Sequence, residues 1–196
     1  MHQSIMAHIA VLGLGNWGSA IARLWLLDGH KVKGWTIEQE VYESITMEGM
    51  NHKYLPDHSL DGLEATMHVE DALDGSEIIV LALPSSVILN VVEDIIQYLR
   101  PGHVLLDLAK GLAPGKRLIS EAIHQMLNDN NMHNPLAILT GPTIAPEAAG
   151  GVMTTALVAS EDMSVADKLA STLTTPTFIL HPASDPVGAE LWGAFK

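Results

Sequence analysis

The sequence predicts an α/β fold with a doubly wound, mostly parallel sheet, and two observations support this class. Short apolar runs alternate along the 196 residues with segments whose apolar residues recur at helical spacing. The run at 77–83 (EIIVLAL) is apolar after its first residue, as expected of a strand buried on both faces of a parallel sheet. The length suffices for one well-buried domain, so we expect residues 1–196 to form a single domain.

Residues 8–18 (HIAVLGLGNWG) predict a strand, a glycine turn and the start of a helix. Gly13 permits a tight turn, Gly15 leaves no Cβ between the backbone and a pyrophosphate, and Gly18 lets the helix approach the strand. The unpaired N–H groups at the start of such a helix face the negative charge of a phosphate. A Rossmann-like dinucleotide site explains this spacing, and a chance glycine turn in an α/β protein is the alternative.

The rest of the chain predicts strands and helices in alternation. We expect further strands at 31–35, 66–69, 77–83, 103–108, 136–139, 156–159 and 177–180. Helices are expected at 17–28, 38–49, 69–73, 87–99, 118–127, 164–173 and from 185 onward. The segment 51–57 is expected to be irregular, and either a surface loop or a wall beside an adenine would explain it.

Three residues follow the second expected strand, at the place where a Rossmann unit meets the adenosine ribose. An acidic residue there favours a ribose 2′-hydroxyl, whereas a nearby Arg suits a 2′-phosphate. The chain offers Thr36, Ile37 and Glu38, with no neighbouring Arg or Lys in the sequence. This pattern favours NAD over NADP.

Polar residues follow three later strands, and the carboxyl ends of parallel strands line the ligand site in such folds. Ser85 and Ser86 come after Pro84, where they either contact a ligand or cap the next helix. Lys110 precedes a glycine in a chain with few cations, which indicates a site role over a solvated charge. Thr143 lies in a turn fixed by two prolines and a glycine, and an ordinary helix cap is the alternative there.

The composition excludes several classes of function. The formal net charge is −13, from 23 acidic residues against ten Lys and Arg, which argues against nucleic acid or an anionic membrane as a partner. Cys is absent and the ten His show no metal-binding spacing, so we expect no metal. The first residues lack the pattern of a signal peptide and no apolar run reaches membrane-spanning length, which predicts a cytoplasmic protein.

An ordered series of motifs runs along nearly the whole chain. The series is GLGNWG at 13–18, Asn51 with YLP at 54–56, LPS at 83–85, KG at 110–111, GPTIAPE at 141–147 and GAELWGAFK at 188–196. It resembles the NAD(P)-dependent glycerol-3-phosphate dehydrogenases. The resemblance implies hydride transfer that interconverts sn-glycerol 3-phosphate and dihydroxyacetone phosphate, a step that supplies precursors of glycerophospholipids.

The resemblance also implies roles for particular residues. Cofactor contacts fall on Gly13, Gly15, Asn16, Trp17, Gly18, Pro84, Lys110 and Ala145. Contacts to the sugar phosphate fall on Lys110, Gly141 and Thr143. Lys196 stands where the family has its general base, and Lys110 would both lower the pKa of that lysine and steady charge on the reacting oxygen.

Two departures from the family pattern bear on function. Ile37 occupies a position that is often basic in the family and contacts the cofactor, which leaves NADP in doubt. The family continues beyond the equivalent of Lys196 into a helical C-terminal domain that this sequence lacks. We therefore expect the chain to fold and bind NAD or NADP but to turn over poorly or not at all.

Alternatives to a dehydrogenase domain stay open from the sequence alone. One is a catalytically silent dinucleotide-binding module or truncated product, and another is a Rossmann-like domain with a different ligand. The apolar end near Trp192 indicates a surface covered by another domain or by a second subunit, so a homodimer is also open.

Overall fold

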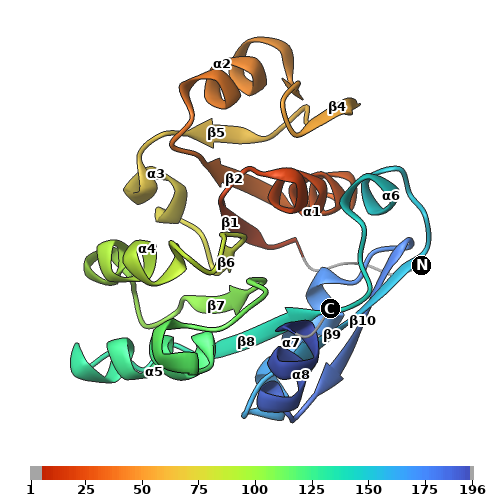
Figure 1. Cartoon of the computed structure of the whole chain (residues 1–196). Helices are drawn as coiled ribbons and strands as arrows, with labels where there is room; N and C mark the ends of the chain where they lie inside the picture. Colours follow the sequence, from red (N-terminus) through yellow and green to blue (C-terminus); the bar gives the residue numbers. More distant parts are fainter. Residues whose placement is uncertain (1–5, 195–196) are drawn as a thin grey trace.

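The structure, a computed structural model, describes residues 6–194 and confirms the doubly wound, mostly parallel α/β fold (Figure 1). One eight-stranded sheet has the order β10-β9-β8-β7-β6-β1-β2-β5, and every pair is parallel except β8 with β9. The strands are β1 (His8–Leu12), β2 (Lys31–Trp35), β5 (Glu64–Thr66), β6 (Ile78–Leu81), β7 (Val104–Asp107), β8 (Leu136–Thr140), β9 (Thr154–Ala159) and β10 (Phe178–Ala183).

Helices cover both faces of this sheet, and each face has its own hydrophobic core. One core includes residues of α1 (Asn16–Leu27), α2 (Gln39–Glu48), α6 (Ala145–Ala149) and α7 (Met163–Leu173). The other includes residues of α3 (Val69–Leu73), α4 (Ile88–Ile95) and α5 (Ile119–Asp129). The short 3₁₀ turns η1 (Ile96–Tyr98) and η2 (Pro114–Lys116) follow α4 and precede α5, and α8 (Pro186–Ala194) packs against β8.

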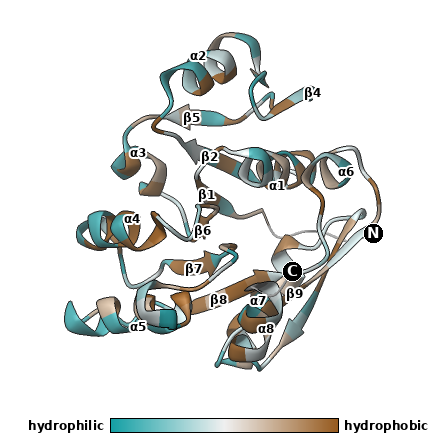
Figure 2. Ribbon diagram, in the orientation of Figure 1, coloured by the Kyte–Doolittle hydropathy of each residue, from teal (hydrophilic) through white to brown (hydrophobic). Residues whose placement is uncertain are grey.

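The central strands explain why their sequences are apolar without alternation. Ile9 and Val11 of β1 belong to one core, while Ala10 and Leu12 belong to the other. Successive side chains point to opposite faces of a strand, so a strand covered on both faces needs apolar residues at every position. Central strands such as β7 and β8 are accordingly brown, the colour of hydrophobic residues, in Figure 2.

Two sequence predictions about secondary structure are wrong, and a third is correct except at its end. Residues 51–57 are not irregular, because β3 (Met50–Asn51) and β4 (Leu55–Ser59) form a separate antiparallel pair. The strand expected at 66–69 ends at Thr66. The expected helix at 87–99 gives way to the 3₁₀ turn η1 after Ile95.

The proposed serine cap before α4 is also absent. Val87 is the N-cap residue and no side chain caps the helix in the described part of the chain. The carbonyl of Pro84 accepts the N–H groups of Val87 and Ile88, at 3.0 and 3.1 Å, so the backbone itself satisfies donors that a serine hydroxyl was expected to satisfy. Ser85 and Ser86 therefore do not cap α4.

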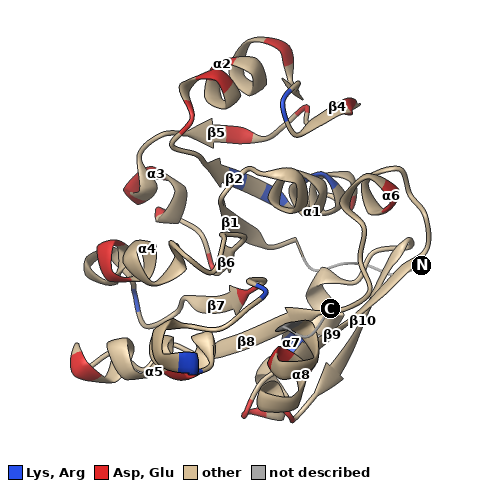
Figure 3. Cartoon of the chain, in the orientation of Figure 1, with Lys and Arg blue, Asp and Glu red and all other residues tan. Residues whose placement is uncertain are grey.

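The charges are distributed unevenly. Asp and Glu are spread over α2, α3, α4 and α5, whereas Lys and Arg appear in few places (Figure 3). Within residues 6–194, no helix combines the length and apolarity that crossing a membrane requires.

Candidate functional site

All the predicted site segments within residues 6–194 lie at one edge of the sheet. They follow β1, β6, β7 and β8, which are parallel strands, so the carboxyl ends of these strands face the same way. The chain also reverses its direction of strand addition at β1, which lies between β2 and β6. In open α/β sheets, this switch point at the carboxyl edge is where ligands bind.

The glycine turn after β1 has room for no side chain at two of its three glycines. Gly13 has φ +102°, and a Cβ there would lie 2.5 Å from the carbonyl oxygen of Ala82 at the end of β6. A Cβ on Gly18 would lie 1.8 Å from the carbonyl oxygen of Gly13. These two glycines are required by the close packing of the turn, the helix and the neighbouring strand.

Gly15 differs, because a Cβ there would meet nothing within 4 Å. Gly15 is the N-cap of α1, no side chain caps that end among the described residues, and the first turn carries no acidic residue. The N–H of Ser19 bonds to the carbonyl of Gly15 at 2.9 Å, so the N–H groups of Asn16 to Gly18 precede the first intrahelical bond. Open space before a row of backbone donors fits a pyrophosphate.

Asn16 and Trp17 occupy the first turn of α1 in different ways. Asn16 is exposed, whereas the ring of Trp17 is partly buried and meets Phe178 of β10 edge to face, with ring centroids 6.1 Å apart. The Trp17 ring therefore takes part in the packing of the core. Its backbone N–H is one of the three that the first turn presents.

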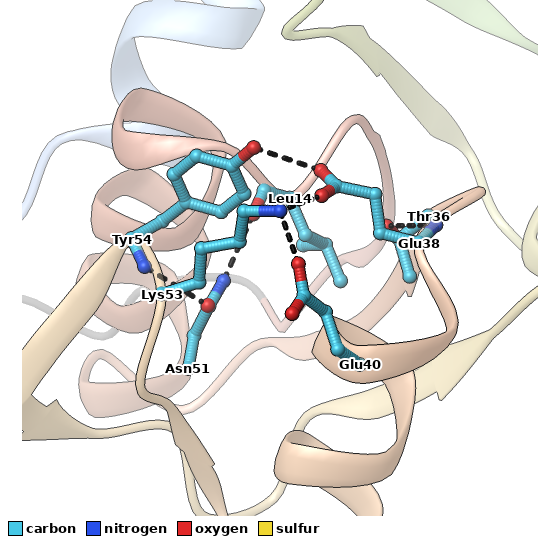
Figure 4. Close-up of polar contacts among 7 residues, drawn as sticks. All are labelled: Leu14, Thr36, Glu38, Glu40, Asn51, Lys53 and Tyr54. Atoms are coloured by element: carbon cyan, nitrogen blue, oxygen red, sulfur yellow. Dashed lines mark hydrogen bonds and ion pairs between the residues drawn. The ribbon is translucent and has the colours of Figure 1, made fainter.

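The sequence has no neighbouring Lys or Arg after β2, but the fold brings a lysine from 15 positions away to this place. Figure 4 shows Lys53, from the turn between β3 and β4, beside Glu38 and Glu40. The Lys53 Nζ donates to Glu38 Oε2 at 2.5 Å and also pairs with Glu40. The Tyr54 hydroxyl donates to Glu38 Oε1 at 2.9 Å. Hydrogen bonds from Lys53 and then Tyr54 hold the pKa of the Glu38 carboxyl below its ordinary value.

The same hairpin is tied to the glycine turn by Asn51, which is fully buried. The Asn51 Nδ2 donates to the Leu14 carbonyl and to Ser19 Oγ, both at 2.9 Å. The Asn51 Oδ1 accepts the N–H of Tyr54 at 3.1 Å. These contacts pack the hairpin, which includes residues 51–57, against the glycine turn.

The turn after β7 places Lys110 at the surface beside a glycine with a positive φ. Gly111 has φ +133°, and a Cβ there would lie 2.9 Å from Ser85 Oγ, so the turns after β6 and β7 are in contact. Pro84, in the first of these turns, is exposed, as is Lys110 in the second.

Asp107, at the end of β7, is a residue that sequence reasoning missed. Its side chain is fully buried, and its Oδ1 accepts the N–H of Ala109 at 2.7 Å, one residue before Lys110. Burial, opposed by this hydrogen bond and reinforced by the Glu190 carboxylate, raises the pKa of Asp107 to about 8. The only sequence signal was an acidic residue at the end of an otherwise apolar strand.

The turn after β8 brings together Gly141, Thr143 and Ala145. The Thr143 N–H donates to the Gly141 carbonyl at 2.9 Å, and a Cβ on Gly141 would lie 2.9 Å from the Cα of Ala156 on β9. Ala145 begins α6 and is partly buried.

The predicted general base, Lys196, lies outside the described residues. The described part of α8 reaches the edge that carries the other site residues, because a Cβ on Gly193 would lie 2.8 Å from Thr140 Oγ1 at the end of β8. Within residues 6–194 there is no cluster of three or more His, Asp or Glu that could hold a metal ion.

The fold and the glycine turn define a Rossmann-like α/β domain whose turn fits a dinucleotide. The family model for the N-terminus of NAD-dependent glycerol-3-phosphate dehydrogenase matches residues 8–166. The chain belongs to this family.

Individual relatives agree with the family model. The chain is 35% identical over 190 residues to a glycerol-3-phosphate dehydrogenase [NAD(P)+] of Halothermothrix orenii, covering 96% of this chain and 54% of that protein. It is 36% identical over 193 residues to the enzyme of the same name from Exiguobacterium, covering 97% and 56%. The crystal structure of glycerol-3-phosphate dehydrogenase from Coxiella burnetii superposes with a TM-score of 0.89 at 29% identity, covering 96% of this chain and 57% of that one. The chain thus spans about half the length of these relatives.

Proposed function

We propose that this chain provides the cofactor-binding part of an NAD(P)-dependent glycerol-3-phosphate dehydrogenase, which interconverts sn-glycerol 3-phosphate and dihydroxyacetone phosphate. The observation that carries the proposal is the open space before Gly15 at the start of α1, in a chain of this family. Because the chain spans about half of its relatives, we assign it cofactor binding and part of the substrate site.

In this proposal the cofactor extends across the carboxyl edge of the sheet. The turn of Gly13, Gly15 and Gly18, with the N–H groups of Asn16 and Trp17, holds the pyrophosphate. The remaining cofactor contacts come from the later turns, at Pro84, Lys110 and Ala145. The chain has only ten cations against 23 acidic residues, so backbone donors must provide most of the attraction for an anionic cofactor.

The substrate side of the site is assigned to Lys110, Gly141 and Thr143. When bound, the nicotinamide ring supplies the hydride chemistry. The Lys110 ammonium donates to the oxygen on C2 of the substrate and stabilises its charge. Thr143 contributes a hydroxyl, and Gly141 contributes only backbone groups, because its packing against β9 excludes a side chain.

A base must remove the proton of the C2 hydroxyl as the hydride leaves. We assign this role to Lys196 from the family resemblance. A lysine serves as a base near neutral pH only if its pKa of about 10.4 is lowered by burial or by a neighbouring cation. Lys110 is the cation that we assign to that task.

Calorimetric titration with NADH and NADPH, each with and without dihydroxyacetone phosphate, tests the proposal. We expect NADH to bind the wild-type chain and Gly15→Val to abolish binding while the chain stays folded, since the added side chain meets only open space. Gly102→Val is the matched control, because Gly102 also faces open space but lies before β7 at the opposite edge. Absence of binding of either cofactor to the folded wild type would contradict the proposal.

A second experiment separates a dehydrogenase from a catalytically silent binding module. The C-terminal half of a relative is added to the chain, and oxidation of glycerol 3-phosphate is measured. Restored turnover supports the dehydrogenase, and binding without turnover favours the silent module. Tighter NADH binding in the presence of dihydroxyacetone phosphate would indicate that Lys110 and Thr143 already form part of a working site.

We also propose that the chain is located in the cytoplasm and forms a homodimer. Val187, Leu191 and Trp192 of α8 are exposed, with 78% of Trp192 accessible, and such apolar side chains are usually covered by another domain or subunit. Sedimentation equilibrium of the purified chain measures whether it is a dimer.

A further inference from the structure

The hairpin formed by β3 and β4 is hydrogen-bonded both to the glycine turn and to the loop after β2. The hairpin carries Asn51 at the end of β3 and Lys53 and Tyr54 in its turn. Each of these side chains contacts the glycine turn or the loop after β2 (Figure 4). Asn51 donates a hydrogen bond to the Leu14 carbonyl, while Lys53 and Tyr54 each donate one to a different carboxylate oxygen of Glu38. A continuous set of hydrogen bonds therefore links the glycine turn to Glu38.

Glu38 stands where a dinucleotide places its adenosine ribose. It follows β2, the neighbour of β1 in the sheet, and lies twenty residues after Gly18. An acidic residue at about this distance accepts a hydrogen bond from the ribose 2′-hydroxyl in Rossmann domains. Thr36 is buried and the Ile37 side chain is apolar, so Glu38 is the acidic group that this loop offers.

The Glu38 carboxylate still has capacity to accept a ligand hydroxyl. Its side chain is 33% exposed. Lys53 and Tyr54 each occupy one site on a different oxygen, and an ionised carboxylate offers about four acceptor sites. The two contacts fix the orientation of the group and leave acceptor sites for a ribose hydroxyl.

The charge of the same group disfavours a 2′-phosphate. Lys53 is paired with both Glu38 and Glu40, so the three side chains together carry one net negative charge. A phosphate entering this place must either remain beside unpaired carboxylate charge or take Lys53 away from its two partners. A 2′-hydroxyl requires neither.

We propose that Glu38, oriented by Lys53 and Tyr54 of the hairpin, is the group that accepts the ribose 2′-hydroxyl and makes the chain prefer NADH over NADPH. Glu38 is the contact residue and Lys53 is a positioning residue that also tempers the negative charge. This inference rests on the proposed function, because it concerns the selectivity of the same cofactor site.

The test compares the dissociation constants of NADH and NADPH for the wild type and three variants at one ionic strength. Glu38→Gln should lower the preference for NADH on the order of tenfold, because it removes a charge beside the 2′ position. Lys53→Gln should shift the preference the other way by a similar factor, since it leaves both carboxylates unpaired. Glu43→Gln is the matched control: Glu43 is exposed on α2, and its side chain accepts only from Gln39 among the contacts of the described residues. It should leave the ratio of the two constants unchanged.

Each outcome decides the inference. Opposite shifts in Glu38→Gln and Lys53→Gln, with none in Glu43→Gln, support it. An unchanged ratio in the first two variants overturns it and leaves the proposed function standing, as does an equal shift in Glu43→Gln, which would indicate a general charge effect. If the folded wild type binds neither cofactor, the proposed function itself is wrong. Thermal unfolding of each variant verifies that it is folded.

Discussion

Burial of one carboxyl group, that of Asp107, makes the stability of the domain depend on pH. The pKa of Asp107 is raised by burial to about 8 in the folded chain, against 3.8 as its ordinary value. Between these two values the folded state keeps a proton that the unfolded state releases. The stability contributed by the protonated group is therefore fully present below about pH 4 and is lost as the pH rises through about 8.

Asp107→Asn should remove this dependence. The amide keeps an oxygen that can accept the N–H of Ala109 but has no proton to release. We expect the free energy of unfolding of the wild type to fall with pH more steeply than that of the variant, by up to about 1.4 kcal/mol per pH unit. Urea unfolding at several pH values between about 4 and 8 measures both slopes, with the exposed Asp167→Asn as a control. Equal slopes would mean that Asp107 is ionised in the folded chain.

At the scale of elements, α5 depends on a residue far away in the sequence. Its N-cap residue is Leu118, whose side chain accepts no hydrogen bond. The buried Glu190 of α8 accepts the N–H of Ile119 at 2.6 Å, the N–H of Ser120 at 3.3 Å and the hydroxyl of Ser120. A carboxylate at a helix N-terminus satisfies free donors and meets the positive end of the helix dipole.

Glu190→Gln should consequently destabilise the chain. The amide retains one acceptor oxygen and loses the charge, and hydrogen bonds to charged groups contribute about 1.5 to 3 kcal/mol each. We expect a loss of unfolding free energy of about 1 to 3 kcal/mol, together with faster hydrogen exchange at the first amides of α5. Glu121→Gln, exposed in the first turn of the same helix, is the control. If both variants lose the same stability, the buried contacts of Glu190 contribute nothing specific.

The same scale shows which elements can be predicted from sequence. Strands such as β1 and β6 are predictable because they are buried on both faces and must be apolar at every position. The hairpin of β3 and β4 is not, since β3 has two residues and is held by the Asn51 side chain against Leu14, a contact across 37 positions. Helix caps show the same limit, because Glu190 caps α5 by accepting the N–H of Ile119, which lies 71 positions away in the sequence.

The spacing of residues in the sequence likewise predicts only part of the candidate site. The glycine turn is readable because Gly13, Gly15 and Gly18 are close in sequence, and the roles of Gly13 and Gly18 in packing follow from the clashes that a Cβ would cause. Lys53 was missed as a partner of Glu38 because 15 residues separate them. Asp107 was missed because its raised pKa comes from burial, and the residue type alone does not show that a position is buried.

For the whole molecule, the net charge of −13 opposes the approach of an anionic cofactor. The backbone donors at the start of α1 act over short distances, whereas the repulsion between the acidic surface and the cofactor acts over the Debye length, about 30 Å at 0.01 M salt and about 10 Å at 0.1 M. Added salt should therefore weaken the long-range repulsion more than the contacts within the bound complex.

We predict that the association rate constant of NADH rises several-fold as ionic strength increases from about 0.01 to 0.1 M, while the dissociation rate constant changes little. Stopped-flow fluorescence of NADH measures both constants, and potassium chloride can be compared with sodium chloride to exclude an effect of one particular cation. A rate that falls with salt would mean that Lys110 and Lys53 attract the cofactor more strongly than the rest of the surface repels it. Local cations, and not the backbone donors with the overall acidity, would then govern how the cofactor arrives.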